Sequence, residues 1–150
     1  MFTSTASRVC QNTADSVNES IRRRTEERVA RTVEAGLPAI DHRLGELDQE
    51  WDIERCLETM APSMTLAGIA LGLTVNRKWF ALSIVVQAFF LQHALQGWCP
   101  PIPVLRRLGV RTLGEIDEER HALKAVRGDY LGMAEQDRRT AQRAFQAARI

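Results

Sequence analysis

Hydrophobic and polar positions divide the chain into polar ends and an apolar centre. The central run from Met60 to Trp98 holds only two formal charges, the adjacent Arg77 and Lys78. The flanking segments 1–58 and 104–150 are rich in Arg, Glu, Asp and Gln. This contrast indicates that the centre and the ends occupy different solvent environments.

The periodicity within each part predicts an all-α fold. Polar amphipathic helices are expected over residues 1–58, a two-helix membrane hairpin over 59–112, and polar helices over 113–150. The predicted architecture is therefore a transmembrane helical hairpin flanked by amphipathic, coiled-coil-like helices.

The first ordered element is expected to be a helix from about Ser16 to Ala35. Ser16-Val-Asn-Glu19 has the capping-box spacing, in which the serine and glutamate side chains satisfy each other's backbone amides. Gly36 interrupts this helix, and Pro38 suits the first turn of the next one.

Apolar residues in that second helix recur at alternating spacings of three and four. They are Leu37, Ile40, Leu44, Leu47 and Trp51, and Ala30 and Val33 extend the phase upstream. The resulting seam over residues 30–51 fits two alternatives: one amphipathic helix lying on its own domain, or a contact with a helix of another protein subunit. In both cases it is a packing surface.

The C-terminal part begins with a second capping-box spacing, Thr112-Leu-Gly-Glu115. One helical face then follows until Gly128 ends the helix, and its residues are Leu113, Ile116, Leu123 and Val126. A last polar helix is expected from about Leu131 to Ala148. Its arginines form either a solvated face or a contact with anionic lipid.

The sequence from Trp79 to Trp98 is the stronger of two predicted membrane spans. Its 20 residues would form a helix about 30 Å long, close to the hydrocarbon thickness of a bilayer, with tryptophan at both interfaces. The preceding run from Met60 to Val75 is shorter, so it would span by local thinning of the bilayer or by extension of its ends. Residues 76–78 suffice to turn one helix into an antiparallel neighbour.

The first span carries a G-x-x-x-G motif formed by Gly68 and Gly72. Such a small-residue face lets another helix approach closely, and its partner is either the second span or another copy of the chain. The second span contains four polar side chains that are costly in hydrocarbon, namely Gln87, Gln92, His93 and Gln96. Because of these side chains, a soluble helical bundle that buries the hairpin in an oligomer stays an alternative. His93 is interpreted as a hydrogen-bonded helix residue.

The second span ends in a distinctive segment, Gly97-Trp-Cys-Pro-Pro101. Gly97 is expected to end the helix, Trp98 to anchor at the interface, and the prolines to prevent helix continuation. Arg106, Arg107 and Arg111 would then lie among lipid headgroups. With Arg43 and Arg55 they outnumber the two basic residues of the turn, which places both termini in the cytoplasm.

Composition and motifs give no indication of catalysis. The 20 basic and 19 acidic residues balance, so the charge does not favour nucleic acid. Cys10, Cys56 and Cys99 form neither a disulfide framework nor a zinc site, and no signal peptide is evident. Because no hydrolytic triad, phosphate-binding glycine loop or metal cluster is found, we expect no enzyme activity, no cofactor and no metal.

An apolar hairpin followed by Gln96-Gly-Trp-Cys-Pro-Pro and by Leu105-Arg-Arg-Leu-Gly-Val-Arg-Thr112 resembles the YgaP-like inner-membrane domain family. Gly97, Cys99 and Pro100 match the family's Gly-x-Cys-Pro element. The resemblance implies a small two-helix protein of the bacterial inner membrane. Some members carry a rhodanese domain for sulfur transfer, but the first 58 residues here are too short and too helical for that fold.

Three functions follow as hypotheses. The first is a non-enzymatic scaffold or accessory protein of the inner membrane that self-associates through Gly68 and Gly72 and binds a partner through the 30–51 seam. The second is a thiol site in which Cys99 relays sulfur or senses oxidants. The third is a soluble helical oligomer.

Overall fold

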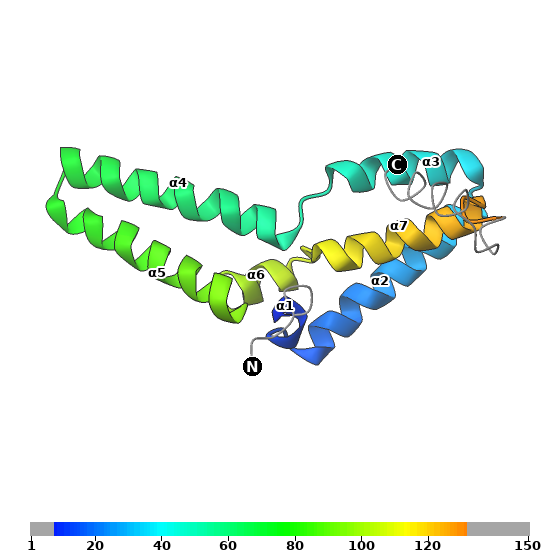
Figure 1. The fold of residues 1–150 in the computed structure, drawn as a ribbon, viewed down its shortest axis with the longest axis horizontal. Coiled ribbons are helices and arrows are strands. Elements are labelled where there is room, and N and C mark those ends of the chain that lie inside the picture. The colour runs from blue at the N-terminus through cyan, green and yellow to red at the C-terminus, as the bar shows by residue number, and fades with distance from the viewer. Residues whose placement is uncertain (1–7, 132–150) are drawn as a thin grey trace, which may run out of the picture. The chain divides into compact units, whose positions relative to one another are not determined.

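The computed structural model describes residues 8–131 as helices joined by short turns, with no strand in this range (Figure 1). The all-α class is therefore confirmed. The chain divides into two compact units: one combines the described residues up to Arg23 with Trp51–Ile116, and the other combines Arg24–Glu50 with the described residues from Asp117. The division falls inside two helices. The three-segment division along the sequence stays a prediction.

The hairpin of the first unit consists of α4 (Ile53–Thr74) and α5 (Phe80–Gln96), which run antiparallel (Figure 1). α4 begins seven residues before Met60, because the Asp52 side chain accepts a hydrogen bond of 2.7 Å from the Arg55 amide and caps the helix there. Its 22 residues extend about 33 Å. The helix that contains the first predicted span is thus longer than that span.

The turn between the two helices contains the short 3₁₀ helix η1 (Arg77–Trp79). The Asn76 side chain accepts a hydrogen bond of 2.9 Å from the amide of Lys78, which caps η1. The chain reverses over residues 75–79, because η1 leads directly into α5. The turn lies where the sequence predicts it but is longer than the predicted residues 76–78.

α5 ends at Gly97, whose φ of 76° is the left-handed conformation that glycine adopts most readily. The predicted helix end is therefore confirmed. The prolines that follow do end α5, but they also open α6 (Ile102–Arg107), with Pro103 in its first turn. The chain thus starts a new helix directly after the prolines that end α5.

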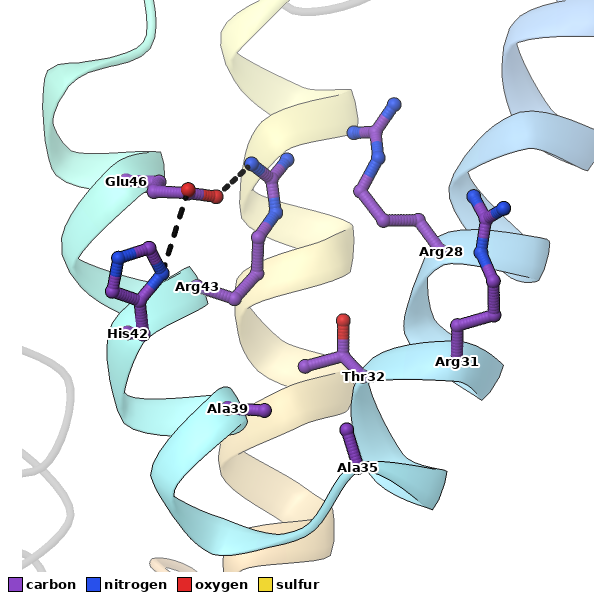
Figure 2. A pocket seen from close by; sticks show the side chains of 8 residues that line it. All are labelled: Arg28, Arg31, Thr32, Ala35, Ala39, His42, Arg43 and Glu46. Atoms are coloured by element: carbon purple, nitrogen blue, oxygen red, sulfur yellow. Dashed lines mark hydrogen bonds and ion pairs between the residues drawn. The ribbon is translucent and has the colours of Figure 1, made fainter.

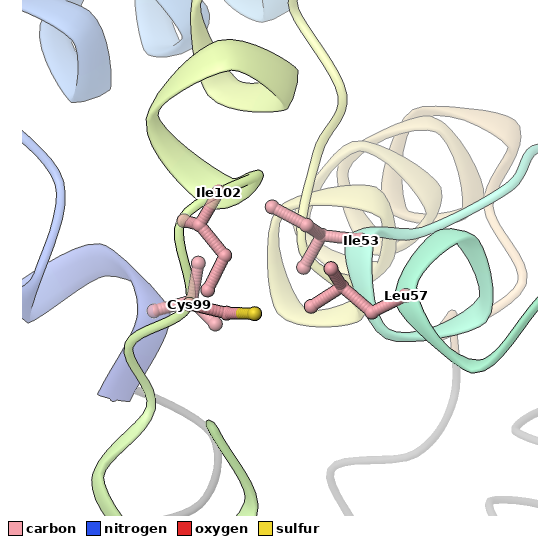
Figure 3. Close-up of a cluster of buried hydrophobic side chains, with 5 residues drawn as sticks. Ile53, Leu57, Cys99 and Ile102 are labelled. Atoms are coloured by element: carbon pink, nitrogen blue, oxygen red, sulfur yellow. The ribbon is translucent and has the colours of Figure 1, made fainter. Parts of the chain in front are cut away.

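The core of the first unit lies where the base of the hairpin meets α6 and the short helix α1 (Arg8–Gln11). Because α1 precedes Ser16, the prediction that the first ordered element begins there is wrong. Figure 3 shows Ile53 and Leu57 of α4 facing Cys99 and Ile102. Val9 of α1 completes this cluster of buried side chains. The backbone amide of Ile53 also donates to the carbonyl of Arg111 at 2.9 Å, which ties the start of α4 to the chain just before α7 (Leu113–Arg127).

The second unit contains most of α2 (Asp15–Glu34), all of α3 (Leu37–Gln49) and most of α7. Gly36, with φ 91°, separates α2 from α3. The three middle residues of the predicted seam, Ile40, Leu44 and Leu47, are buried within the chain. Leu37 and Trp51 are exposed, and Trp51 lies beyond the end of α3, so the buried seam is shorter than predicted.

The two predicted capping boxes have different outcomes. α2 begins at Asp15, which places Ser16 inside the helix and shows that its predicted capping position is wrong. Thr112 and Glu115 form the predicted box: the Thr112 amide donates to the Glu115 carboxylate at 2.8 Å, and the Glu115 amide to the Thr112 hydroxyl at 3.3 Å. α7 ends before Gly128, as predicted. The predicted last helix lies almost wholly outside the described residues.

Candidate functional site

The small-residue face of α4 packs directly against the second helix of the hairpin. A Cβ atom added at Gly68 would lie 2.5 Å from the Ser83 hydroxyl oxygen, and one at Gly72 would lie 2.9 Å from the Phe80 ring. Both glycines are buried. Of the two partners that the sequence leaves open for this motif, the structure thus places α5 on it.

Polar side chains also link the two helices inside the hairpin. The Ser83 hydroxyl donates to the carbonyl of Thr65 at 2.9 Å. The Thr65 hydroxyl donates to the carbonyl of Ala61 at 2.8 Å and accepts from the Gln87 carboxamide at 2.8 Å. These bonds satisfy hydroxyl groups that would be costly to leave unpaired in an apolar environment.

The outward surface of the hairpin is apolar along both helices. The described residues contain two helical stretches that are long and apolar enough to cross a membrane, and few of their side chains are buried by the chain itself. The large exposed side chains are Met60, Met64, Leu66, Ile69 and Leu73 of α4 and Ile84, Val85, Leu91 and Leu95 of α5. An apolar surface of this kind needs an apolar environment to cover it.

A partly buried polar cluster closes the base of the hairpin. The ring Nε2 of His93 on α5 lies 2.7 Å from a carboxylate oxygen of Glu54 on α4, and His93 is only 2% exposed. The Arg8 guanidinium on α1 lies 3.3 Å from the other Glu54 oxygen and donates to the Ala94 carbonyl at 2.9 Å. His93 is thus a hydrogen-bonded helix residue, as predicted. The cluster joins three helices and includes no hydroxyl or thiol nucleophile.

A second polar network surrounds Arg106, which is 1% exposed. Its guanidinium donates to both carboxylate oxygens of Glu115 at 2.6 and 2.7 Å and to the Asn18 side chain at 2.8 Å. Burial alone would raise the pKa of Glu115, but the hydrogen bonds from Arg106 and from the Thr112 amide lower it.

The arginine network corrects a prediction about the exit segment. Arg106 and Arg111 were expected among lipid headgroups, whereas both are buried within the chain. The turn after α6 brings Glu115 beside Arg106, so the arginine charge is paired inside the protein. Arg107 alone of the three is exposed.

The candidate reactive thiol, Cys99, is 5% exposed and packs in the apolar core of Figure 3. Burial raises the pKa of the Cys99 thiol, and no arginine contributes to this shift. Cys10 donates to Glu115 at 3.8 Å, and burial together with that carboxylate raises its pKa as well. Since the thiolate is the reactive form, these environments suit packing better than sulfur chemistry.

A groove of about 470 Å³ lies between α2 and α3 in the second unit (Figure 2). Arginines and a histidine line it, yet Glu46 lies 2.8 Å from Arg43 and 3.4 Å from His42. Arg28 and Arg43 also pair with the buried Glu119. The arginines are therefore engaged largely in ion pairs of the protein itself.

Within the described residues, no group of three or more His, Cys, Asp or Glu side chains is arranged to hold a metal ion. No family model, curated protein or solved structure matches the chain. The resemblance to the YgaP-like family thus rests on the residues quoted from the sequence and stays a prediction.

Proposed function

We propose that the chain is an integral membrane protein in which α4 and α5 cross the bilayer as a helical hairpin. The observation that carries this proposal is the distribution of side chains around the hairpin. Gly68, Gly72 and the Ser83 hydroxyl lie in the contact between the helices together with the Phe80 ring, whereas many large apolar side chains point outward along both helices. A soluble core has the opposite arrangement, with its largest apolar side chains inside.

The ends of the hairpin fit the two membrane interfaces. Trp79 lies at the tip beside Arg77 and Lys78, and Trp98 lies at the base. Aromatic and basic side chains are favoured at headgroup depth on either side of the hydrocarbon. The contact between Glu54 and His93 keeps both ends of the hairpin on one side of the membrane.

The base and both termini are assigned to the cytoplasmic side of an inner membrane. This assignment is supported by the resemblance to the YgaP-like family and by the positive-inside rule. Burial removes Arg106 and Arg111 from the count of interfacial charges, and Arg55 and Arg107 remain exposed on that side. The cytoplasmic assignment therefore depends more on the family resemblance than on the count of basic residues.

The biochemical role that fits this arrangement is a non-enzymatic scaffold or accessory protein. The polar networks join helices to one another, and the carboxylates of Glu54 and Glu115 are bound by other side chains of the protein. Three buried nitrogens of these networks have no hydrogen-bond partner among the described residues, namely Arg8 Nε, His93 Nδ1 and Arg106 Nε. α2, α3 and α7 would form a polar helical unit anchored by the hairpin, with exposed Leu37 available to a partner protein. A thiol relay gains no support, because Cys99 is buried and its pKa is raised.

Membrane fractionation tests the proposal. The protein should stay with the membranes through an alkaline carbonate wash and should need detergent for release. Replacing outward-facing Leu66 and Ile84 with Asp should move it to the soluble or aggregated fraction, because each charge costs about 2.5–3.5 kcal/mol at the centre of a span. The control, Asp at exposed Leu131 outside the hairpin, should leave the protein in the membrane. Recovery of the parent protein as a soluble particle would contradict the proposal.

A further inference from the structure

We propose that Gln87 binds a second copy of this chain inside the bilayer, through hydrogen bonds between the carboxamides of two hairpins. This inference rests on the proposed membrane insertion. It assigns self-association to one face of α5, whereas the sequence suggested the G-x-x-x-G face of α4, which α5 already covers.

Gln87 would lie deep in the hydrocarbon layer, where an amide without hydrogen-bond partners is energetically unfavourable. Gln87 is eight residues from Trp79, a rise of about 12 Å along a helix, so it would lie near the middle of a hydrocarbon layer about 30 Å thick. Gln87 is also exposed on the surface of the hairpin. An amide at that depth has no water to bind.

The hairpin provides a hydrogen-bond partner for only one of the polar groups of the Gln87 carboxamide. The Thr65 hydroxyl gives its hydrogen to the Ala61 carbonyl, so its oxygen accepts from the Gln87 nitrogen, and this fixes which end of the amide faces Thr65. Within the described residues, the carbonyl oxygen of the amide and its second N–H hydrogen have no hydrogen-bond partner. One donor and one acceptor thus point to a further polar group.

The neighbours of Gln87 form a surface suited to another helix. Ile84, Gln87, Leu91 and Ala94 follow one another at spacings of three, four and three, and all four are exposed. This is the a/d spacing of a helix–helix seam, in which a single polar residue at an a or d position fixes register and the number of helices. Polar side chains also hydrogen-bond across helix contacts in membranes.

A second copy of the chain is the occupant that this chemistry favours. A carboxamide is both donor and acceptor, so two of them related by a twofold axis can exchange a reciprocal pair of hydrogen bonds. Each copy then satisfies the other without any additional component. The flanking apolar side chains would pack on their symmetry mates.

The test measures association of the full chain in phosphatidylcholine vesicles by energy transfer between donor- and acceptor-labelled copies. Gln87→Leu should weaken association about tenfold, as expected from the loss of two interhelical hydrogen bonds. Gln92→Leu is the matched control, because it makes the same chemical change off the seam and should leave association unchanged. Thr65→Val removes the hydrogen bond inside the hairpin but keeps the carboxamide, and it should also leave association intact.

Each contrary outcome has one meaning when carbonate extraction accompanies the measurement. If the parent chain is integral but monomeric, or if Gln87→Leu associates like the parent, the inference is overturned and membrane insertion stands. Equal loss of association in Gln87→Leu and Thr65→Val would also overturn it, since Gln87 would then act only through the hairpin. If the parent chain is extracted by carbonate, the proposed function itself fails.

Discussion

The Ser83 hydroxyl occupies the space into which a side chain on Gly68 would extend. An added Cβ would lie 2.5 Å from this oxygen and 3.2 Å from the Trp79 carbonyl. The Ser83 hydroxyl is itself held by the carbonyl of Thr65 at 2.9 Å. The two helices therefore approach so closely that only glycine fits at this position of α4.

Gly68→Ala should destabilise the hairpin by about 1–3 kcal/mol, the usual cost of overpacking a tight contact. Unfolding in detergent micelles, followed by circular dichroism, measures the change. The matched control is Gly45→Ala in α3, where nothing lies within 4 Å of the added methyl group. That variant should be stabilised by up to about 1 kcal/mol, because alanine favours a helix over glycine. Similar effects at both positions would contradict the close packing at Gly68.

Glu115→Gln should be among the most destabilising single changes in the first unit. It keeps an acceptor for the Thr112 amide but leaves the buried Arg106 charge without its carboxylate, at a cost of about 3–5 kcal/mol. Thr112→Ala, which removes only a capping hydroxyl, should cost about 1 kcal/mol. Denaturant titration of the two variants in detergent compares them. Equal losses would show that Glu115 acts only as a helix cap.

Acid should weaken the same region. Because the pKa of Glu115 is lower in the folded chain than in the unfolded one, its contribution is fully present above the unfolded value, which is 4.5 for an ordinary glutamate. That contribution is lost as the pH falls through the folded pKa. Unfolding free energies measured between about pH 6 and pH 3 should decline less steeply in Glu115→Gln than in the parent. Parallel slopes would contradict this account.

Cys99 should react slowly with maleimides in the folded protein. Burial limits access to the thiol and raises its pKa, so little thiolate forms at neutral pH. In a variant with Cys10→Ser and Cys56→Ser, mass spectrometry should show modification of Cys99 mainly after denaturation. Modification of the folded chain as fast as a free cysteine would restore the thiol hypothesis.

Local patterns in the sequence predict much of the hairpin correctly. The length of the apolar runs, the turn at residues 76–78 and the helix end at Gly97 depend on nearby residues, so each is legible before the fold is known. The capping box of Thr112 and Glu115 is local in the same way. The start of α4 is less evident, because Ile53–Thr59 is polar enough to resemble a separate segment.

Long-range pairing is what the sequence does not reveal. Arg106 looks like an interfacial cation until the chain folds back and presents Glu115 and Asn18 to it. Glu54 and His93 lie 39 residues apart, and no periodicity links them. The partner of Gly68 and Gly72 was equally open, because a small-residue face fits any closely approaching helix. The contacts of Asn18, Glu54 and His93 therefore become visible only once the fold is known.

The most direct test of the central claim asks whether the tip of the hairpin and the polar helices lie on opposite sides of a membrane. In a background of Cys10→Ser, Cys56→Ser and Cys99→Ala, single reporters are introduced as Lys78→Cys at the tip and Gly45→Cys in α3, both exposed. An impermeant maleimide is added to spheroplasts, in which the cytoplasmic membrane is intact and its outer face is exposed to the reagent. The account predicts labelling at position 78 from outside and labelling at position 45 only after the membrane is opened. Labelling of both positions from the same side would contradict a spanning hairpin.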